Sequence, residues 1–228
     1  MYKGKRFLAI IPARGGSKGI PKKNIYKING KPLIYYSIHE ALKSNFLDRV
    51  IVSTDSEEIA QVSKFYGAEV PFIRPLELAT DTSKTIDVLL HAIEQCGNKN
   101  DNYDYLVLLQ PTQPLRKSFH IDKAIKKIVD CHQKSLVSVS KVKEHPILMR
   151  TISKEGFLEN ILNIDSTVRR QDFPDFYKVN GAIYINKIDD SFTSKTSLND
   201  NNFPFIMDEK YDLDIDTFED IEQFKLRS

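Results

Sequence analysis

The chain has 228 residues with 41% hydrophobic and 28% charged residues, which suits one large globular domain and excludes collagen-like and disordered classes. Its net charge of +2 does not indicate a nucleic-acid partner. No apolar run approaches the roughly 18 residues needed to span a bilayer, and the stretch at 7–12 is too short for a signal-peptide core. We therefore expect a cytoplasmic protein without a membrane partner.

The first part of the chain alternates strand and helix patterns. An apolar run at residues 5–13 predicts a strand buried on both faces, and a helical stripe follows at 33–46. A further helix is expected to begin at an Asp55 N-cap, with Glu58 three residues later. Other strands are expected at 49–54, 68–73, 103–109 and 135–139, and helices at 84–95 and 119–131. This alternation predicts an α/β, Rossmann-like domain with a mostly parallel sheet.

The alternation stops after Ser140. Residues 149–152 and 157–160 flank a Ser-Lys-Glu-Gly turn and predict a β-hairpin. An Arg-rich polar stretch at 165–178 precedes a strand at 182–185, a polar loop at 189–202 and a short helix at 218–224. We interpret 141–178 as an excursion from a single domain that spans 1–228. Cys96 and Cys131 lack metal-ligand spacing, and we expect free, buried thiols.

The charges are unevenly distributed. The first 39 residues carry nine Lys or Arg and no acid, whereas residues 208–222 carry eight acids and one base. One end of the chain therefore suits an anion and the other a cation. The alternative is that both segments are solvated surface.

The loop after the first predicted strand has a composition that suits phosphate. Ligands of open α/β sheets bind at the carboxyl ends of strands, where this loop lies. Three glycines allow backbone N–H groups to approach an anion, and four nearby side chains are cationic: Gly15, Gly16, Gly19, Arg14, Lys18, Lys22 and Lys23. The loop matches neither the P-loop nor the dinucleotide pattern, and the alternative is an ordinary surface turn.

Four ordered motifs resemble one enzyme family. The segment IPARGGSKGIPKKN at 11–24 resembles the N-terminal signature of the CMP-sialic acid synthetases, the N-acylneuraminate cytidylyltransferases. The segments LQPTQPLR at 109–116, RRQDFP at 169–174 with NGAIY at 180–184, and DLDIDTFED at 212–220 resemble the family's later motifs. Gln113 stands where the family usually has Ser, and we assign it no role from the sequence.

The resemblance implies a reaction and a set of nucleotide ligands. A nine-carbon acidic sugar would react with CTP to give the CMP-sugar and pyrophosphate, largely through positioning and charge neutralisation. Lys23, Arg14 and Asp214 are the expected catalytic residues, with the acceptor of the hydroxyl proton left open between Asp214 and a metal-bound hydroxide. The expected nucleotide ligands are Arg14, Gly15, Gly16, Ser17, Lys18, Lys23, Asn24, Arg74 and Thr85.

The acids Asp214 and Asp216 are separated by two positions. On a strand both carboxylates would point to one face and could hold Mg²⁺ together with substrate phosphates. Helix N-capping is the alternative for Asp216 or Thr217, but not for Asp214.

The resemblance also implies a sugar site and a second subunit. Its expected sugar ligands are Gln110, Arg170, Gln171, Lys178, Asn180 and Tyr184. Residues 141–178 would form a dimerisation arm that delivers basic side chains to the neighbouring site of a homodimer. On composition alone, surface charge is the favoured explanation for the cations of the arm.

Three other functions stay open. A synthetase for another acidic sugar, such as legionaminate, pseudaminate or 3-deoxy-octulosonate, would share the chemistry. A nucleotide-sugar glycosyltransferase could use Asp214-Ile-Asp216 as its DxD motif but would release no pyrophosphate. A non-catalytic nucleotide-binding module would bind CTP without turnover.

Overall fold

The computed structural model describes residues 1–97, 103–162, 167 and 169–227. Its strands are β1 (Phe7–Pro12), β2 (Lys27–Ile28), β3 (Lys31–Pro32), β4 (Arg49–Ser53), β5 (Tyr105–Leu108), β6 (Ser135–Lys141), β7 (Arg150–Ile152), β8 (Leu158–Asn160), β9 (Tyr177–Lys187) and β10 (Pro204–Ile206). Its α-helices are α1 (Leu33–Leu42), α2 (Glu57–Phe65), α3 (Thr85–Cys96), α4 (Ser118–Asp130) and α5 (Phe218–Arg227). Short 3-10 helices include η1 (Lys23–Ile25), η3 (Pro146–Leu148) and η4 (Arg170–Asp172).

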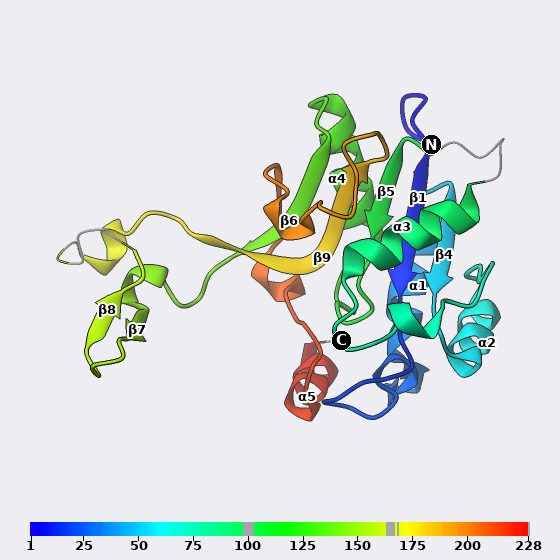
Figure 1. Ribbon diagram of the computed structural model, residues 1–228. Coiled ribbons are helices and arrows are strands. Elements are labelled where there is room, and N and C mark those ends of the chain that lie inside the picture. Colours follow the sequence, from blue (N-terminus) through cyan, green and yellow to red (C-terminus); the bar gives the residue numbers. More distant parts are fainter. Residues whose placement is uncertain (98–102, 163–166, 168, 228) are drawn as a thin grey trace.

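A central sheet of six strands organises the fold. The strand order is β10-β6-β9-β5-β1-β4, and β9 pairs antiparallel with both of its neighbours while the other pairs are parallel (Figure 1). The expectation of an α/β fold with a mostly parallel sheet is therefore confirmed. β9 extends well beyond the predicted strand at 182–185, because its N-terminal half pairs with the end of β6.

Helices cover both faces of this sheet. Alternate residues of β1 enter opposite cores: Phe7, Ala9 and Ile11 contribute to one core, and Leu8 and Ile10 to the other. The first core receives apolar side chains of α1, α2 and α4, and the second those of α3. This two-sided burial is the reason that the strand appears in the sequence as a continuous apolar run.

A third apolar cluster joins the two ends of the chain. Ile20 from the glycine-rich loop packs with Ile215 and with Phe224 of α5. At Gly19 a Cβ atom would collide with the backbone carbonyl of Asp216, so a glycine is needed for this close approach. The basic N-terminal loop and the acidic C-terminal segment are thus neighbours.

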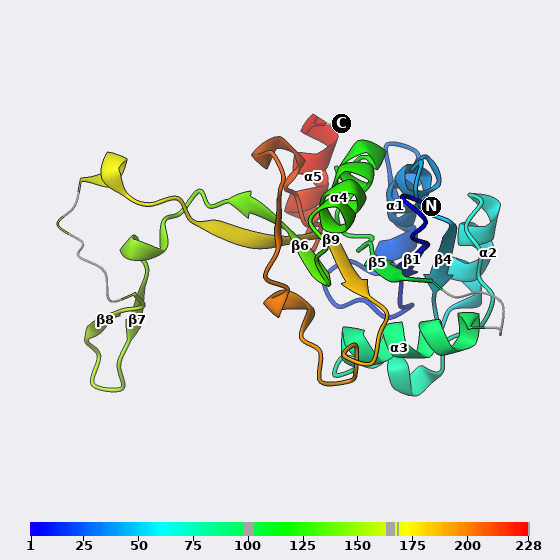
Figure 2. The ribbon, with the colours of Figure 1, turned by 90° about the horizontal axis from the view of Figure 1, so that it is seen from above.

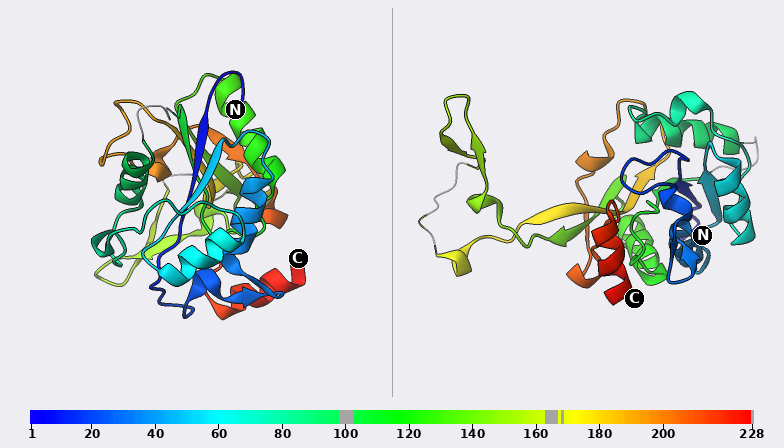
Figure 3. Two further views of the ribbon diagram at one scale, coloured as in Figure 1. Left: turned by 90° about the vertical axis from the view of Figure 1, so that its right-hand side faces the viewer. Right: turned by 90° about the horizontal axis from the view of Figure 1, so that it is seen from below.

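An arm projects from the body between β6 and β9 (Figures 1 and 2). The two strands leave the body as a ribbon whose last pair is Lys141 and Tyr177. At its base, Nε2 of His145 lies 2.8 Å from the carbonyl oxygen of Pro174. Further out, β7 and β8 form the expected hairpin, which the right-hand view of Figure 3 also shows away from the sheet.

Some local expectations were wrong. Residues 68–73 form only one isolated bridge, Ile51 with Glu69, because Pro71 cannot donate to a strand ladder. The expected helix at 33–46 ends at Leu42. The chain's two cysteines, both within the described ranges, form no disulfide, but only Cys96 is buried and Cys131 is exposed. Among the described residues, no helix is long and apolar enough to cross a membrane.

Candidate active site

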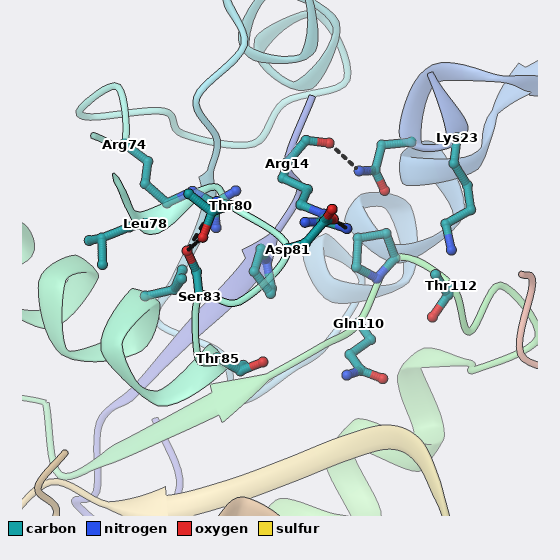
Figure 4. A pocket seen from close by; sticks show the side chains of 14 residues that line it. Arg14, Lys23, Arg74, Leu78, Thr80, Asp81, Ser83, Thr85, Gln110 and Thr112 are labelled. Carbon is teal, nitrogen blue, oxygen red and sulfur yellow. Dashed lines mark hydrogen bonds and ion pairs between the residues drawn. The ribbon is translucent and has the colours of Figure 1, made fainter. Parts of the chain in front are cut away.

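A cavity of about 270 Å³ opens at the carboxyl ends of β1 and β5. Figure 4 shows Arg14, Lys23, Arg74 and Thr85 around it, contributed by the glycine-rich loop, the segment after α2 and the start of α3. Asn24 also lines it, and its Nδ2 donates to the carbonyl oxygen of Arg14 over 2.9 Å. Five of the expected nucleotide ligands therefore share one cavity. The others, Gly15, Gly16, Ser17 and Lys18, belong to the same loop but do not line the cavity.

A largely buried carboxylate, that of Asp55, holds the loop beside this cavity. Oδ1 of Asp55 accepts a hydrogen bond from the backbone N–H of Gly15 at 3.0 Å and lies 3.3 Å from Nη2 of Arg74. Arg74 is 4% exposed, and burial lowers the pKa of its guanidinium while Asp55 opposes that shift. The expectation that Asp55 caps α2 was wrong, because the Ser56 side chain accepts from the N–H of Ile59 instead.

The two cations at the mouth of the cavity share one carboxylate. Arg14 Nη2 and Lys18 Nζ lie 2.8 and 2.9 Å from the carboxylate oxygens of Asp81. Both cations lower the pKa of Asp81, with the contribution of Lys18 the larger. Sequence reasoning missed Asp81, because a lone acid in a polar loop carries no pattern of its own.

Lys23 connects the basic loop to the acidic segment. Its Nζ lies 2.8 Å from Oδ1 of Asp216 and donates to the carbonyl oxygen of Ile215 at 3.1 Å. Lys23 is largely buried, with 17% of its side chain exposed, whereas the Asp216 side chain is 69% exposed. The first cavity therefore reaches the acidic segment through Lys23.

The acidic pair lies on extended chain rather than on a strand. Residues 212–216 belong to no ladder, so the expectation of a strand was wrong. Burial nevertheless alternates: Leu213 and Ile215 are buried while Asp214 and Asp216 are exposed. The backbone N–H of Ile215 donates to the carbonyl oxygen of Thr112 at 2.9 Å, which attaches this segment to the loop after β5.

The two carboxylates influence each other. The pKa of Asp214 is raised, first because surrounding protein desolvates its carboxyl and further because Asp216 repels its charge, while Thr112 and Lys23 oppose the shift. The residue as a whole keeps exposed surface, so one side of the carboxyl stays accessible. Within the described ranges, no group of three or more His, Cys, Asp or Glu is arranged to hold a metal ion.

A second cavity, of about 460 Å³, adjoins the first. It contains the expected sugar ligands Gln110, Lys178, Asn180 and Tyr184, together with Asp214. Lys178 Nζ lies 3.0 Å from Asp212 Oδ2, and the Tyr184 hydroxyl donates to Asn199 Oδ1 at 3.2 Å. The arrangement offers a paired cation and several hydrogen-bonding groups to an acidic, polar ligand.

Asn180 has mostly a structural environment. It is 4% exposed, its Oδ1 accepts from Ser138 Oγ at 2.6 Å, and its Nδ2 donates to Ser140 Oγ at 2.8 Å. This network holds β9 against β6 at the irregular register near Ser138. The side chain is therefore committed within the protein, although the residue borders the cavity.

Gln110 stands where three cavities meet. It lines the first two and also a third, bounded by residues 194–199. The backbone carbonyl oxygen of Gln110 accepts hydrogen bonds from Ser37 Oγ and from Nη1 of the fully buried Arg116, each at 3.2 Å. Burial lowers the pKa of Arg116, which has a hydrogen-bonding role here that its position in the LQPTQPLR motif did not reveal.

The expected sugar ligands Arg170 and Gln171 lie elsewhere. Both are exposed at the start of η4 in the arm, and neither lines a cavity described above. The arm carries them away from the body of their own chain (Figure 2). One chain thus brings together only part of the expected set.

Comparison with known proteins places the chain. The sequence profile of the family described as Cytidylyltransferase matches residues 8–224, nearly the whole length. The chain belongs to the cytidylyltransferase family. In this member of the family, Arg14 and Lys23 line the first of two adjoining cavities, and Asp214 lines the second.

Relatives whose names give different substrates have similar sequence identity to this chain. The chain is 37% identical over 215 residues to an N-acylneuraminate cytidylyltransferase of Streptococcus agalactiae, covering 93% of this chain and 51% of that protein. It is 38% identical to a CMP-N,N'-diacetyllegionaminic acid synthase of Legionella pneumophila and 36% to a pseudaminic acid cytidylyltransferase of Campylobacter jejuni, covering 91% and 94% of those proteins. The respective shares of this chain are 93% and 96%. The chain spans about half the length of the streptococcal relative.

Solved structures agree on the fold. A CMP:2-keto-3-deoxy-manno-octonic acid synthetase superposes with a TM-score of 0.72 at 17% identity over 97% of this chain and 98% of that one. A 4-diphosphocytidyl-2C-methyl-D-erythritol synthase from Anaerococcus prevotii gives a TM-score of 0.67 at 12% identity over 98% of both chains. At these identities the likeness concerns the fold alone.

Proposed function

We propose that this protein transfers the cytidylyl group of CTP to an N-acylneuraminate-like, nine-carbon acidic sugar. A hydroxyl oxygen of the sugar would attack the α-phosphorus, the new P–O bond would form as the bond to the β-phosphoryl oxygen breaks, and pyrophosphate would leave. The observation that carries the proposal is the junction of the two cavities, where Gln110 borders both, Lys23 lines the first and Asp214 the second.

The chain's own cations would position the nucleotide. Arg14 and Lys23, which both line the first cavity, would bind phosphate oxygens and neutralise the charge that grows on the leaving group. Asn24, Arg74 and Thr85 line the rest of the first cavity and would contact the nucleoside. No side chain needs to form a covalent bond, because in-line transfer depends on positioning and charge.

Asp214 and Asp216 fit a Mg²⁺ ion. Their alternation with buried Leu213 and Ile215 turns both carboxylates to the exposed side, and the raised pKa of Asp214 reflects in part repulsion from Asp216, which Lys23 opposes. Oxygen ligands from one or two carboxylates plus substrate phosphates are typical of protein-bound Mg²⁺. The bound ion would polarise the phosphates and neutralise their charge.

We also propose that two copies of the chain complete each other's sites through the arm. The hairpin has only two strands, and such hairpins are marginally stable alone. Within the described ranges, eight large apolar side chains of the arm and its base are exposed: Leu148, Met149, Ile152, Phe157, Leu158, Ile161, Tyr177 and Val179. Apolar surface of this extent needs a partner. A second copy would bring Arg170 and Gln171 to the neighbour's second cavity, where an acidic sugar requires cations.

The reaction is tested by measuring pyrophosphate release with CTP, Mg²⁺ and a panel of nine-carbon acids. The panel contains N-acetylneuraminic, N,N'-diacetyllegionaminic and pseudaminic acids, the last two matching relatives of equal similarity, and the eight-carbon 3-deoxy-octulosonic acid serves as a comparison. We expect turnover with at least one nine-carbon acid and the highest kcat/KM with the neuraminate. Release with none of the nine-carbon acids would contradict the proposal.

The metal pair is tested by Asp214→Asn and Asp216→Asn. Each should reduce turnover at least 100-fold with only a modest loss of CTP binding, because the cationic loop stays intact. Asp208→Asn, an exposed acid of the same segment, serves as the matched control. Turnover within about threefold of the wild type for both variants would remove the acids from the metal site.

The shared site is tested by mixing inactive parents. Lys23→Ala and Arg170→Ala should each be nearly inactive, with Lys154→Ala at the hairpin turn as an active control. After subunit exchange half of the dimers are hybrids, each with one doubly altered and one intact site, so about a quarter of the sites should recover. A mixture that forms hybrids yet stays inactive would show that Arg170 does not act in the neighbour's site.

A further inference from the structure

Gln113 is a buried amide without a partner. The residue lies in the turn between β5 and α4 and is 1% exposed. Neither its Nε2 nor its Oε1 makes a hydrogen bond within the described part of the chain. A buried polar group left unpaired destabilises a protein. The presence of an unpaired amide at this position therefore needs an explanation other than the packing of the turn.

The amide of Gln113 lies beside that of Gln110. A Cβ atom built on Gly181 would lie 2.6 Å from Gln110 Oε1 and 3.6 Å from Gln113 Nε2, so both side chains end against the same point of β9. Gly181 has φ of +75°, and a larger residue there would displace the Gln110 amide. Gln110 and Gly181 line the second cavity, and Gln113 lies behind them.

Gln110 has a fixed backbone and a side chain that can turn. Ser37 Oγ and Arg116 Nη1 hold its carbonyl oxygen, and the N–H of Gln113 approaches the same atom at 3.4 Å. Its side-chain amide makes no hydrogen bond within the described ranges. Rotation of that amide by half a turn exchanges a donor for an acceptor toward the cavity. Whatever fixes the rotation decides which substituent the cavity accepts.

We propose that Gln113 is the positioning residue that fixes this rotation and thereby sets substrate preference. The two amides are not hydrogen-bonded in the structure, and a rotation of the Gln113 side chain would let its Nε2 donate to Gln110 Oε1, so that Gln110 Nε2 is presented to the second cavity as a donor. A fixed donor selects the carbonyl oxygen of an acylamino substituent, a strong acceptor, over a hydroxyl group at the same carbon. This assignment rests on the proposed function, because it takes an acidic sugar as the occupant of the second cavity.

The test replaces Gln113 by a residue of similar length without polar atoms. Gln113→Met removes the donor and also the unpaired buried amide, so the variant should fold and melt at or above the wild-type temperature. The matched control is Gln95→Met, the same change at an exposed position on α3. The assay uses two acids that differ only by an acetamido group in place of a hydroxyl.

We expect the ratio of kcat/KM for the acetamido acid to that for the hydroxyl acid to fall about tenfold in Gln113→Met, within the usual worth of a neutral hydrogen bond. The KM for CTP should stay unchanged, and the control should keep the wild-type ratio. Because both acids are measured on one preparation, a partly unfolded variant does not alter the ratio. A ratio within twofold of the wild type would overturn the proposal.

A double-mutant cycle separates positioning from packing. In a Gln110→Met background, Gln113→Met should change the ratio no further, since Gln113 acts only through Gln110. An equal change in both backgrounds would overturn the proposal. Failure of the wild type to release pyrophosphate with any acid would overturn the proposed function instead. The same ratio, measured as Kd by titration calorimetry in the presence of CMP, would then decide the role of Gln113.

Discussion

The first cavity and the arm differ in how far their side chains are paired within one chain. Every cation of the cavity already has an anionic partner in its own chain: Asp81 for Arg14, Asp216 for Lys23 and Asp55 for Arg74. The cavity also lies on three apolar clusters that include both ends of the chain. The arm instead presents apolar side chains outward, with Phe157 and Leu158 each 72% exposed. The charged groups of the cavity are therefore paired within a single chain. The arm, in contrast, has the apolar composition typical of a surface that a partner covers.

The largest effect is expected in the cavity, from Lys23→Ala. Loss of a preorganised cation beside the phosphates should lower kcat by about 10²–10³, as the loss of one charge-stabilising group typically does. Affinity for CMP should fall much less, because CMP lacks the two phosphates that Lys23 is proposed to contact. Steady-state kinetics and CMP titration measure both quantities.

Lys22→Ala is the control for this prediction. Lys22 is the preceding residue in the same loop, is largely exposed and pairs with Glu58 at 2.6 Å. Equal losses of turnover and CMP affinity in Lys23→Ala would place its side chain on the nucleoside instead.

The body should also lose stability in acid through His120, a buried residue of α4. Its Nδ1 accepts from the N–H of Lys117, and burial, reinforced by the charges of Lys123 and Arg116, lowers its pKa to about 4. The ordinary value is 6.5, so below that pH the unfolded chain binds a proton that the native state does not. The free energy of unfolding should therefore fall by about 3 kcal/mol between pH 6.5 and 4.

His120→Gln isolates this contribution. Glutamine can still accept the capping hydrogen bond but does not titrate, so its urea-unfolding free energy should vary less with pH than that of the wild type. His132→Asn, at an exposed position, should keep the wild-type dependence. Parallel curves for His120→Gln and the wild type would show that His120 does not contribute.

Removal of apolar side chains from the arm should weaken the association of two chains rather than the folding of one chain. Phe157→Ser and Leu158→Ser together should weaken the proposed dimer by at least tenfold in Kd, because each removes a side chain that association would bury. The melting of the monomeric body should hardly change. Sedimentation across a dilution series measures the effect, with Leu226→Ser, 88% exposed on α5, as the control. Unchanged association in the double variant would show that the hairpin is not the interface.

The smallest effect is expected from Asp81→Asn. An exposed ion pair contributes little to stability, so the variant should fold normally. Release of Arg14 and Lys18 should lower the KM for CTP about two- to fivefold, since the phosphates no longer compete with the carboxylate. Asp175→Asn breaks an equally exposed pair with Lys141 in the arm and should leave this KM unchanged. A raised KM in Asp81→Asn would mean that Asp81 supports nucleotide binding.

The sequence by itself determined the order and type of most elements. The apolar run before Gly15 predicted β1, the turn at 153–156 predicted the β7–β8 hairpin, and the helical stripes predicted α1, α3 and α4. These signals are local, because periodicity and turn chemistry depend on residues a few positions apart. The same-face arrangement of Asp214 and Asp216 was also local, and it survived although no strand forms there.

Only the tertiary structure decided which distant groups meet. Asp55 binds Gly15 and Arg74 rather than capping a helix. Lys23 forms an ion pair with Asp216, although the two residues lie near opposite ends of the sequence. The unpaired amide of Gln113 likewise becomes visible only when β9 brings Gly181 against it. Such contacts depend on the order of the strands in the sheet, because that order decides which loops meet at the same edge of the sheet. No local pattern encodes that arrangement, because it results from burying every apolar face of the chain at once.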